Sequence, residues 1–410
     1  MKTDYFMNKT IWFISKYCTP EKKKIAGSRG WYLIKEFSNK GYQTVLISSV
    51  LKNTNNKINP KFKFKNYKKD GVKIILLKTL NYSIRKSMKR IFSWLDFELK
   101  LFFLDKSILP KPNVIIISSL SILTILNGIF LKNKFNCKLV FEIRDIWPLT
   151  LVEEGNFSKK NPFIFFLKYL EKFGYKKADF IVGTMPHLKL HVNNILGYNK
   201  SVNCIPMGVS DNLLKNKEDI SSEYIQKYLN PNFFNILYVG SIGITNALDT
   251  LFKTAEILSG NFKIKFVIVG DGYLRDHYIK KYKHLSNLIF APKVHKNKVQ
   301  SVLSYANVLY FGTYKSKVWK YGQSLNKLID YMISAKPIIA SYSGYQSMIN
   351  EANCGFFIPA EDPNLLAKTI IKITKIKKSK LNIIGKKGRN WLLQNRKYNK
   401  LADDYLKILF

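Results

Sequence analysis

The sequence predicts an α/β protein built from two doubly wound domains, each with a parallel sheet covered by helices on both faces. Short apolar, β-branched runs alternate with helical segments along the 410 residues, which is the pattern of βαβ units. The polar stretch 215–231 interrupts this alternation and separates the two series of strands and helices. At ~150 residues per domain, this length suits two or three domains, each with its own core.

The first domain is predicted to span residues 1–210. The run Ile11–Ile14 indicates a strand, and a glycine loop at 27–30 connects it to a helix over 31–39. Further strands are expected over 44–48, 73–77, 114–117, 139–143, 180–182 and 203–205. These apolar runs are typical of strands buried on both faces of a parallel sheet.

The second domain is predicted to span residues 211–385. Its expected strands cover 235–239, 265–269, 288–290, 308–310 and 337–340, and its clearest helices cover 248–258 and 325–334. The remaining residues, 386–410, are expected to form a C-terminal helix that packs back on the first domain.

The composition excludes several classes of protein. A hydrophobic fraction of 46% argues against intrinsic disorder. The four cysteines lie far apart in sequence and form no metal-binding pattern. The cysteines therefore support neither a zinc site nor a disulfide scaffold, and we expect no bound cofactor. No helix-turn-helix, zinc or RNP pattern is present. A nucleic-acid-binding protein is therefore the weaker hypothesis to explain the excess of basic residues.

The net charge of +41 is the most unusual number in the composition. Only seven of the 68 basic residues are arginine, so part of the excess is explained by drift in an AT-rich genome, and part by an anionic partner. Two basic, aromatic-rich stretches, Ile84–Lys106 and Lys159–Lys177, suit helices that lie on an anionic membrane. Residues 52–106 alone carry a net charge of +11. Core helices with a solvated lysine face explain the same residues.

One segment resembles a membrane span. Residues 113–131 carry no charge over 19 residues, close to the ~20 that cross a bilayer. Pro112 and the run Val114–Ile117 instead favour a buried strand, with serines that begin the next helix. No cleavable signal peptide is evident at the N-terminus. We expect a cytoplasmic protein, peripheral on the inner face of the plasma membrane.

Two glycine loops follow strands of the second domain. Gly240, Ser241 and Gly243 come after the strand 235–239, and Gly270 and Gly272 come after the strand 265–269. Open parallel sheets bind ligands at the carboxyl ends of their strands, where glycine lets phosphate oxygens approach backbone N–H groups. Ordinary βα turns also favour glycine, but two such loops in one domain favour a nucleoside diphosphate.

A third motif begins the helix expected over 325–334. Lys327 and Asp330 lie three residues apart, so they share one helix face. A lysine near a helix N-terminus can neutralise a diphosphate, and an aspartate one turn later can bind ribose hydroxyls. The alternative is an ordinary surface ion pair between the two.

The first domain places charges at the end of its strand 139–143. Glu142, Arg144 and Asp145 stand close together there, which suits either an active site in a cleft or a structural ion-pair corner. Glu153 and Glu154 are adjacent and so point ~100° apart on a helix, which argues against a joint acid–base role.

Taken in order, these motifs resemble bacterial glycosyltransferase family 4, and in particular the N-acetylfucosaminyl-type transferases that build O-antigen and capsule. The similarity runs from about residue 11 to 405, and the segments that carry it are Gly27-Ser28-Arg29, Arg144–Val152, Ile205–Val209, Gly240–Asp249, Ser324–Met332, Ala335-Lys336-Pro337 and Glu361-Asp362-Pro363.

The resemblance implies a GT-B fold, with two Rossmann-like domains facing a cleft. It implies a retaining, metal-independent enzyme that moves a sugar from a nucleotide diphosphate, expected to be UDP, to a polyprenyl-diphosphate-linked glycan. Asp330 takes the second position of the family's Glu-x7-Glu motif, but Gly322 stands at the first. Arg144 likewise stands where many members have histidine.

The resemblance also assigns candidate roles to individual residues. The expected catalytic residues are Asp145, beside the acceptor hydroxyl, and Lys327, on the departing diphosphate. The acceptor is expected to contact Gly27, Ser28, Arg29 and Arg144. The donor is expected to contact Gly240, Ser241, Gly243, Gly270, Gly272, Ser324, Asn326, Lys327 and Asp330. Because of Gly322, a catalytically inactive GT-B scaffold remains the main alternative.

Overall fold

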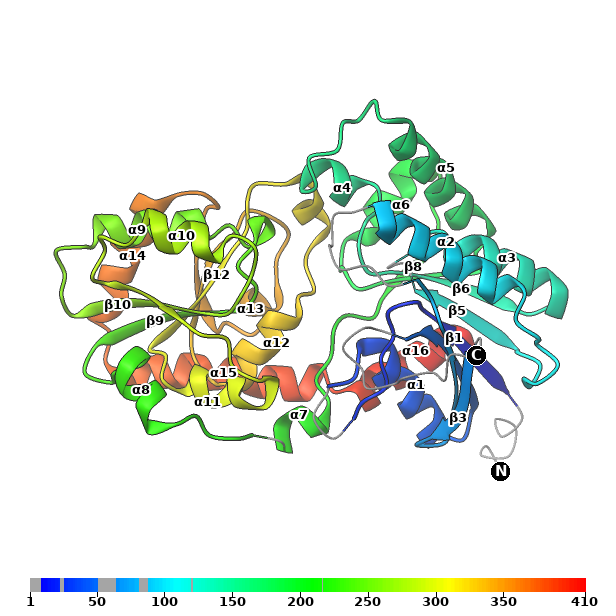
Figure 1. Cartoon of the computed structure of the whole chain (residues 1–410), viewed down its shortest axis with the longest axis horizontal. Helices are drawn as coiled ribbons and strands as arrows, with labels where there is room; N and C mark the ends of the chain where they lie inside the picture. Colours follow the sequence, from blue (N-terminus) through cyan, green and yellow to red (C-terminus); the bar gives the residue numbers. More distant parts are fainter. Residues whose placement is uncertain (1–8, 23–25, 51–63, 81–87, 119–120, 216) are drawn as a thin grey trace. The chain divides into compact units, whose positions relative to one another are not determined.

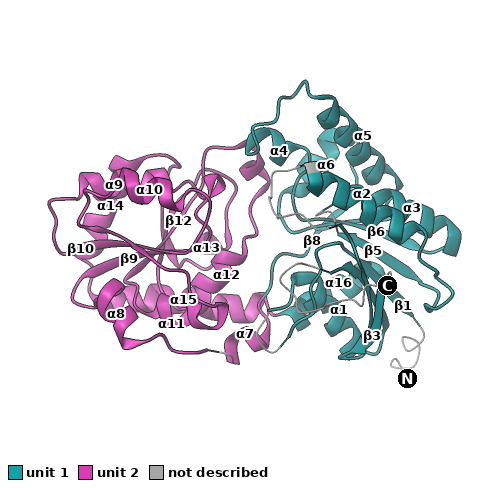
Figure 2. Ribbon diagram, in the orientation of Figure 1, with its two compact units in different colours: residues 1–208, 398–410 teal, residues 209–397 magenta. Residues whose placement is uncertain are grey.

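The computed structural model describes residues 9–22, 26–50, 64–80, 88–118, 121–215 and 217–410. The chain divides into two compact units, residues 1–208 with 398–410 and residues 209–397 (Figures 1 and 2). Each unit is built around one sheet, and each sheet has its own apolar core. Parts of the predicted membrane-facing stretch 52–106, namely 52–63 and 81–87, lie outside the described residues.

The first unit contains an eight-stranded sheet in the order β3-β4-β2-β1-β5-β6-β7-β8. Its strands are β1 (Thr10–Ile14), β2 (Gln43–Ser49), β3 (Phe64–Lys69), β4 (Val72–Leu77), β5 (Val114–Ser118), β6 (Lys138–Ile143), β7 (Phe180–Gly183) and β8 (Val202–Cys204). Its helices are α1 (Arg29–Asn39), α2 (Met88–Phe102), α3 (Thr124–Phe135), α4 (Leu149–Glu153), α5 (Pro162–Lys177), α6 (Leu188–Leu196) and α16 (Tyr398–Leu409). All pairs in this sheet are parallel except β3–β4.

Helices cover both faces of this first sheet, because side chains alternate between the faces along each strand. Phe13 of β1 belongs to the core formed with α1 and α16, whereas Trp12 contacts Phe135 of α3 on the opposite face, with ring centroids 5.3 Å apart. A doubly wound sheet results, as the sequence predicts.

The edge strand β3 was not predicted from the sequence. It pairs antiparallel with β4 through a turn at Asp70 and Gly71, both of which have positive φ. An Asp-Gly pair is the typical two-residue hairpin turn. The strand reads FKNYKK and is mostly exposed, which suits a lysine-rich sheet edge but hides the apolar pattern that identifies buried strands.

The second unit contains a six-stranded parallel sheet in the order β11-β10-β9-β12-β13-β14. Its strands are β9 (Phe234–Val239), β10 (Ile264–Val269), β11 (Leu288–Ala291), β12 (Val308–Gly312), β13 (Ile338–Ser341) and β14 (Gly355–Ile358). Its helices are α7 (Asp211–Lys215), α8 (Ser222–Tyr228), α9 (Leu248–Ile257), α10 (Arg275–Lys281), α11 (Val299–Ser304), α12 (Asn326–Ile333), α13 (Met348–Glu351), α14 (Pro363–Thr374) and α15 (Lys378–Asn395), with short 3₁₀ turns η1 (Ile244–Asn246), η2 (Lys296–Lys298) and η3 (Lys317–Tyr321). The strand order reverses between β9 and β12, which is where such sheets bind ligands.

The C-terminal segment differs from the single helix predicted over 386–410. It forms two helices, of which α15 belongs to the second unit and α16 to the first. Glycine explains the placement of α15: a Cβ on Gly385 would lie 2.0 Å from the Ala335 carbonyl oxygen, and one on Gly388 would lie 2.9 Å from Cys354. These close approaches hold α15 against the second unit, so only α16 returns to the first.

The segment 113–131, which resembles a membrane span in sequence, contains β5 and the first part of α3. Among the described residues, we find no helix with the length and apolar character needed to cross a bilayer. The apolar run is therefore used inside the sheet of the first unit, where Val114, Ile115, Ile116 and Ile117 are fully or almost fully buried.

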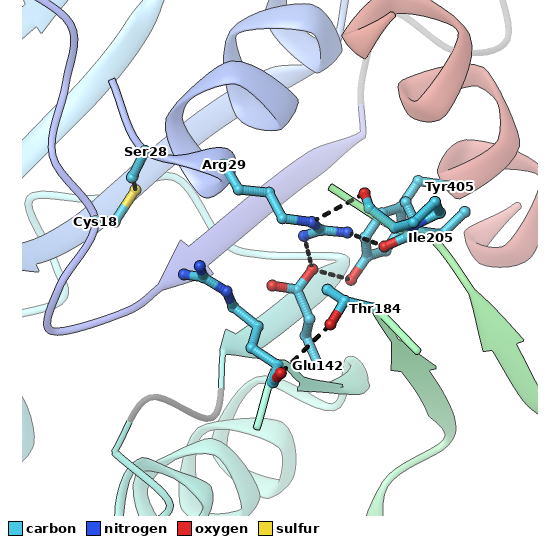
Figure 3. A network of polar contacts seen from close by, with 9 residues as sticks. Cys18, Ser28, Arg29, Glu142, Thr184, Ile205 and Tyr405 are labelled. Atoms are coloured by element: carbon cyan, nitrogen blue, oxygen red, sulfur yellow. Dashed lines mark hydrogen bonds and ion pairs between the residues drawn. The ribbon is translucent and has the colours of Figure 1, made fainter. Parts of the chain in front are cut away.

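A buried ion pair joins four segments of the first unit (Figure 3). Arg29, the first residue of α1, donates from Nη1 to Glu142 Oε2 at the end of β6. Its Nη2 also donates to the Ile205 carbonyl at 2.5 Å, and its Nε to the Pro206 carbonyl at 3.4 Å. Tyr405 of α16 reaches the same Glu142 oxygen at 3.5 Å.

This network overturns one sequence prediction. Arg29 was expected to bind an acceptor phosphate, but its side chain is fully buried and its donors are directed at Glu142 and two carbonyls of its own unit. A buried guanidinium needs such partners, because removing a charge from water costs several kcal/mol. Arg29 therefore stabilises the first unit and is not placed to contact a ligand.

We expect the Glu142→Leu variant to lose about 3–5 kcal/mol of unfolding free energy, because it leaves the Arg29 charge buried without its carboxylate. The double variant Arg29→Met/Glu142→Leu should recover part of this loss, since neither charge remains. Urea unfolding followed by circular dichroism would measure both values.

The surface pair Lys40–Asp403, with Nζ and Oδ1 2.6 Å apart, offers a control in the same unit, between the end of α1 and α16. Asp403→Ala should cost no more than about 1 kcal/mol, as exposed ion pairs do. Equal losses in the Glu142 and Asp403 variants would contradict the structural role given to the buried pair.

Candidate functional site

Most of the residues expected to contact a donor lie at one edge of the second sheet. The strands β9, β10, β12 and β13 run in parallel, so the loops that follow them emerge at a common carboxyl edge. These loops begin at Gly240, Gly270, Thr313 and Tyr342. We call the part formed by residues 240–243, 270–272 and the start of α12 the glycine-loop site.

The two glycine loops are in backbone contact with each other. A Cβ on Gly270 would lie 1.9 Å from the Gly240 carbonyl oxygen, and a Cβ on Gly272 would lie 2.1 Å from the Ile242 carbonyl oxygen. The Gly240 N–H donates to the Val269 carbonyl at 3.0 Å, and the Ile242 N–H to the Asp271 carbonyl at 2.9 Å. These glycines are therefore required to bring the loops together, whatever ligand the loops bind.

Lys327 lies against the first of these loops. Its Nζ donates to Asn246 Oδ1 at 2.6 Å and to Tyr238 Oη at 3.0 Å, and it sits 4.3 Å from the centroid of the Tyr238 ring. A Cβ on Gly240 would lie 3.2 Å from Lys327 Cε. The ammonium is therefore held in one position beside the Gly240 loop, by partners that carry no charge.

Burial changes the protonation equilibrium of Lys327. Desolvation lowers its pKa to about 7, because burial disfavours the charged form. Among the described residues, no carboxylate forms an ion pair with this ammonium. A phosphate bound here would supply the missing negative charge.

The N-terminus of α12 adds backbone donors to the same place. Its N-cap is Leu325, which provides no side-chain cap, and Asn326 at its first position is exposed. Uncapped N–H groups and the helix dipole both favour an anion. Asn326 and Lys327 are the first two residues of α12, and Ser324 directly precedes its N-cap; of the three, Lys327 has the contacts to the Gly240 loop described above.

Asp330 lies one turn further along α12. Both of its carboxylate oxygens accept from Lys296 of η2, at 2.6 and 2.5 Å. Desolvation raises the pKa of Asp330, and Lys296 opposes that shift. The alternative of an ion pair between Lys327 and Asp330 is therefore wrong, because each side chain has partners of its own.

The loop between β12 and α12 contains buried polar atoms without partners. Gln323 is only 5% exposed, yet neither its Oε1 nor its Nε2 has a hydrogen bond among the described residues, and the same holds for Trp319 Nε1. A buried polar group left unpaired costs about 1–3 kcal/mol. Gln323 directly follows Gly322, where the sequence lacks the expected glutamate, and only this adjacency could have drawn attention to it.

The last residue of the Gly240–Asp249 motif has a structural role. Asp249 Oδ2 accepts from Tyr278 at 3.0 Å and from Tyr314 at 2.6 Å. It thereby joins α9 to α10 and to the loop after β12. The Gly243 backbone is similarly close to Tyr273, whose ring would lie 3.2 Å from a Cβ at that position.

In the first unit, Asp145 follows β6 and is exposed. Desolvation raises the pKa of Asp145, while Arg144 and Arg90 oppose the shift. The pKa of Glu154 is also raised, to about 7, mainly by desolvation and further by the negative charges of Asp145 and Glu153. The sequence argument dismissed Glu154 because of its neighbour Glu153, but folding instead brings it within electrostatic reach of Asp145.

Gly27 and Ser28, the other expected acceptor contacts, lie at the start of α1. Ser28 Oγ donates to Cys18 Sγ at 3.1 Å and accepts from the Thr19 N–H at 3.0 Å. A Cβ on Gly27 would lie 2.5 Å from Trp31. These contacts account for both residues through local packing, and the structure does not test their expected role in acceptor binding.

Comparison with known proteins bears on the second unit. Residues 234–376 match the family model of glycosyl transferases group 1. No curated protein sequence matches the chain at a significant level. The family match confirms the expected glycosyltransferase class at the level of this domain.

Among the described residues, we find no group of three His, Cys, Asp or Glu side chains placed to hold a metal ion.

The fold is also found in solved structures. Sucrose-phosphate synthase from Thermosynechococcus elongatus is 16% identical with a TM-score of 0.72, and covers 98% of each chain. A trehalose-6-phosphate structure from E. coli, bound with UDP-2-fluoro glucose, is 12% identical with a TM-score of 0.72, covering 98% of this chain and 99% of that one. Anabaena HepE in complex with UDP-glucose is 12% identical with a TM-score of 0.64 and the same coverage. These similarities confirm the predicted GT-B fold over nearly the whole chain.

We expect Gly270→Ala to destabilise the second unit by at least about 1–3 kcal/mol, because the added methyl group would overlap the Gly240 carbonyl and force the loops apart. Gly260→Ala is the matched control, since no atom lies within 4 Å of a Cβ at Gly260. It should change stability by no more than about 0.5 kcal/mol. Urea unfolding of both variants would test this, and equal stabilities would show that the loops do not depend on their contact.

Proposed function

We propose that this chain is a retaining, metal-independent glycosyltransferase that moves a sugar from UDP to a polyprenyl-diphosphate-linked glycan in O-antigen or capsule synthesis. One observation carries the donor half of the proposal. Lys327 holds its ammonium, without a carboxylate partner, beside the Gly240 loop and at the uncapped start of α12. The acceptor half follows from the resemblance of the ordered motifs.

In this proposal the donor diphosphate binds at the glycine-loop site. Backbone N–H groups of the loops and of α12 contact its oxygens, and Lys327 supplies a positive charge. As the bond to the sugar breaks, negative charge grows on the diphosphate. Fixed hydrogen-bond donors in a poorly hydrated site stabilise that charge without having to reorganise. In this proposal they replace a metal ion as the group that stabilises the leaving diphosphate.

The nucleoside is expected to lie towards Asp330. Its carboxylate, held by Lys296, is a suitable acceptor for ribose hydroxyls, and the raised pKa of Asp330 reflects its partial burial. The structures of E. coli and Anabaena proteins with UDP-2-fluoro glucose and UDP-glucose have the same fold. They motivate UDP as the nucleotide.

Gln323 offers a contact to the transferred sugar. Its amide is buried and has no hydrogen-bond partner in the part of the chain that the structure describes, and a sugar presents hydroxyls that both donate and accept, as an amide does. We propose that this amide takes the role of the glutamate that Gly322 replaces. Sites with such buried polar groups discriminate strongly against ligands that leave them unpaired.

Asp145 remains the candidate for the group beside the acceptor hydroxyl, with Arg144 as a contact for an acceptor phosphate. Desolvation raises the pKa of Asp145, and the pKa of the nearby Glu154 is raised to about 7. The value for Glu154 supports this part, because a carboxyl group that exchanges a proton near neutral pH suits general acid–base chemistry.

The placement of the donor diphosphate can be tested at Lys327. Since its pKa is about 7 in the free protein, a bound diphosphate should raise that pKa and draw up to one proton from solution at pH 8. UDP should therefore bind more weakly as the pH rises above 7. Lys327→Met should lose both the proton uptake and at least tenfold in affinity, which corresponds to about 1.4 kcal/mol. Calorimetry in two buffers of different ionisation enthalpy, with EDTA present, measures both.

Lys253→Met is the matched control, because Lys253 is exposed on α9 in the same unit. It should bind UDP like the parent protein. Equal affinity and equal proton uptake in the Lys327 variant would overturn the placement of the diphosphate. UDP binding without transfer or hydrolysis of any UDP-sugar would favour the inactive scaffold.

The proposed contact to the transferred sugar can be tested at Gln323. Gln323→Leu removes an unsatisfied amide while keeping its volume, so the variant should be at least as stable as the parent protein. It should bind UDP with unchanged affinity, yet its kcat/KM for the UDP-sugar should fall about 10- to 100-fold. Thermal unfolding, UDP calorimetry and donor kinetics together measure these three values.

Gln226→Leu, on the exposed surface of α8, is the control for the same chemical change. A Gln323 variant that is less stable but keeps its donor kinetics would show that the amide only supports the loop.

A further inference from the structure

The helix α2 exposes apolar side chains on the side that should face water. Its inner side packs on the unit through buried Trp94, Phe97 and Leu101. Its outer side carries large apolar residues at helical spacing, and these are Phe92, Leu95, Leu99 and Phe102, followed by Phe103, with exposures of 54, 44, 60, 45 and 78%. A helix that is apolar on both sides normally has a second partner.

The neighbouring helices extend this surface. In the first unit α2 packs against α3, and α3 packs against α5 (Figure 1). Phe130 of α3 is exposed and contacts Phe102, with ring centroids 4.9 Å apart. On α5, Phe165, Phe166 and Tyr169 are exposed as well. We call this surface of α2, α3 and α5 the apolar face. Exposed large apolar side chains gathered on neighbouring helices are typical of interaction sites on soluble proteins.

Positive charge accompanies the apolar face. The three helices carry nine basic and three acidic side chains. Each acidic side chain is engaged within the unit: Asp96 with Lys100, Glu98 with Thr124 and Asn127, and Glu171 with His191.

Several lysines beside the apolar face are available to an outside partner. Lys168, Lys172, Lys176 and Lys177 of α5 are exposed, and no carboxylate among the described residues forms an ion pair with them. Lysine can bury its alkyl stem against apolar groups while its ammonium stays in a polar layer.

We infer that the apolar face docks the protein on an anionic lipid bilayer. Aromatic and leucine side chains would enter the boundary between headgroups and acyl chains, while the lysines contact anionic headgroups. A second copy of this chain is the poorer occupant, since two chains of charge +41 would bring like-charged surfaces together. The inference does not depend on the proposed transfer reaction.

The test is co-sedimentation of the full chain with lipid vesicles at physiological salt. Binding to vesicles of phosphatidylethanolamine and phosphatidylglycerol should be at least tenfold tighter than to phosphatidylcholine vesicles, and 0.5 M salt should weaken it. The variant Leu95→Gln/Leu99→Gln/Phe103→Gln should lose at least tenfold in binding to the anionic vesicles. Lys168→Gln/Lys172→Gln/Lys176→Gln should lose the preference for anionic lipid.

A matched control is Ile257→Gln/Phe262→Gln/Ile383→Gln, which changes three exposed apolar residues of the second unit. It should bind vesicles like the parent protein. Equal binding by both apolar variants, or equal binding to neutral and anionic vesicles, would overturn the inference. So would a dimer in sedimentation velocity that only the α2 variant abolishes, since a second copy would then be the occupant.

The fold of each variant is checked without reference to the bilayer. All substituted side chains are exposed, so thermal unfolding should match the parent protein. A docking failure with unchanged UDP binding would leave the proposed function standing, and normal docking without UDP binding would leave the membrane inference standing.

Discussion

Parallel pairing of the strands is the constraint on which the rest of this structure depends. In a parallel sheet every crossover returns the chain to the same edge, so the loops that follow the strands gather there. In the second unit this gathers Gly240, Gly270 and the start of α12 from segments that lie up to about ninety residues apart in sequence. The two glycine loops lie in close backbone contact there, and the Lys327 side chain lies against the Gly240 loop.

Two of the buried or partly buried cations, Arg29 and Lys327, illustrate two uses of charge. Arg29 is satisfied by Glu142 and by two backbone carbonyls, and it joins α1, β6 and the segment near Ile205 within the first unit. Within the described part of the chain Lys327 has neutral partners only, and burial lowers its pKa to about 7. Removing one partner of a buried ion pair is costly, because the other charge is then left without compensation. A desolvated charge that has no counter-charge is instead a candidate for binding a ligand of opposite sign.

Local pattern made much of this structure predictable. The buried strands, the glycine loops after β9 and β10, and the shared face of Lys327 and Asp330 each follow from short-range periodicity and spacing. Local sequence pattern did not predict the elements whose structure depends on long-range contacts. The exposed edge strand β3 lacks an apolar run, and the division of the C-terminus into α15 and α16 depends on glycines that touch the second unit. The basic, aromatic-rich stretch 84–106 was evident in the sequence, but only the structure showed which of its apolar side chains are buried and which are exposed on the outer side of α2.

The sequence by itself determined the fold class and the chemistry available at the sheet edge, because both depend on residue types at fixed spacings along one element. Only the tertiary structure decided which of those residues are free to act. It turned Arg29 inward to Glu142, paired Asp330 with Lys296 and left the Gln323 amide without a hydrogen-bond partner among the residues that the structure describes. Those outcomes depend on which segments meet in space and how much water each side chain keeps, and neither quantity is encoded in local pattern.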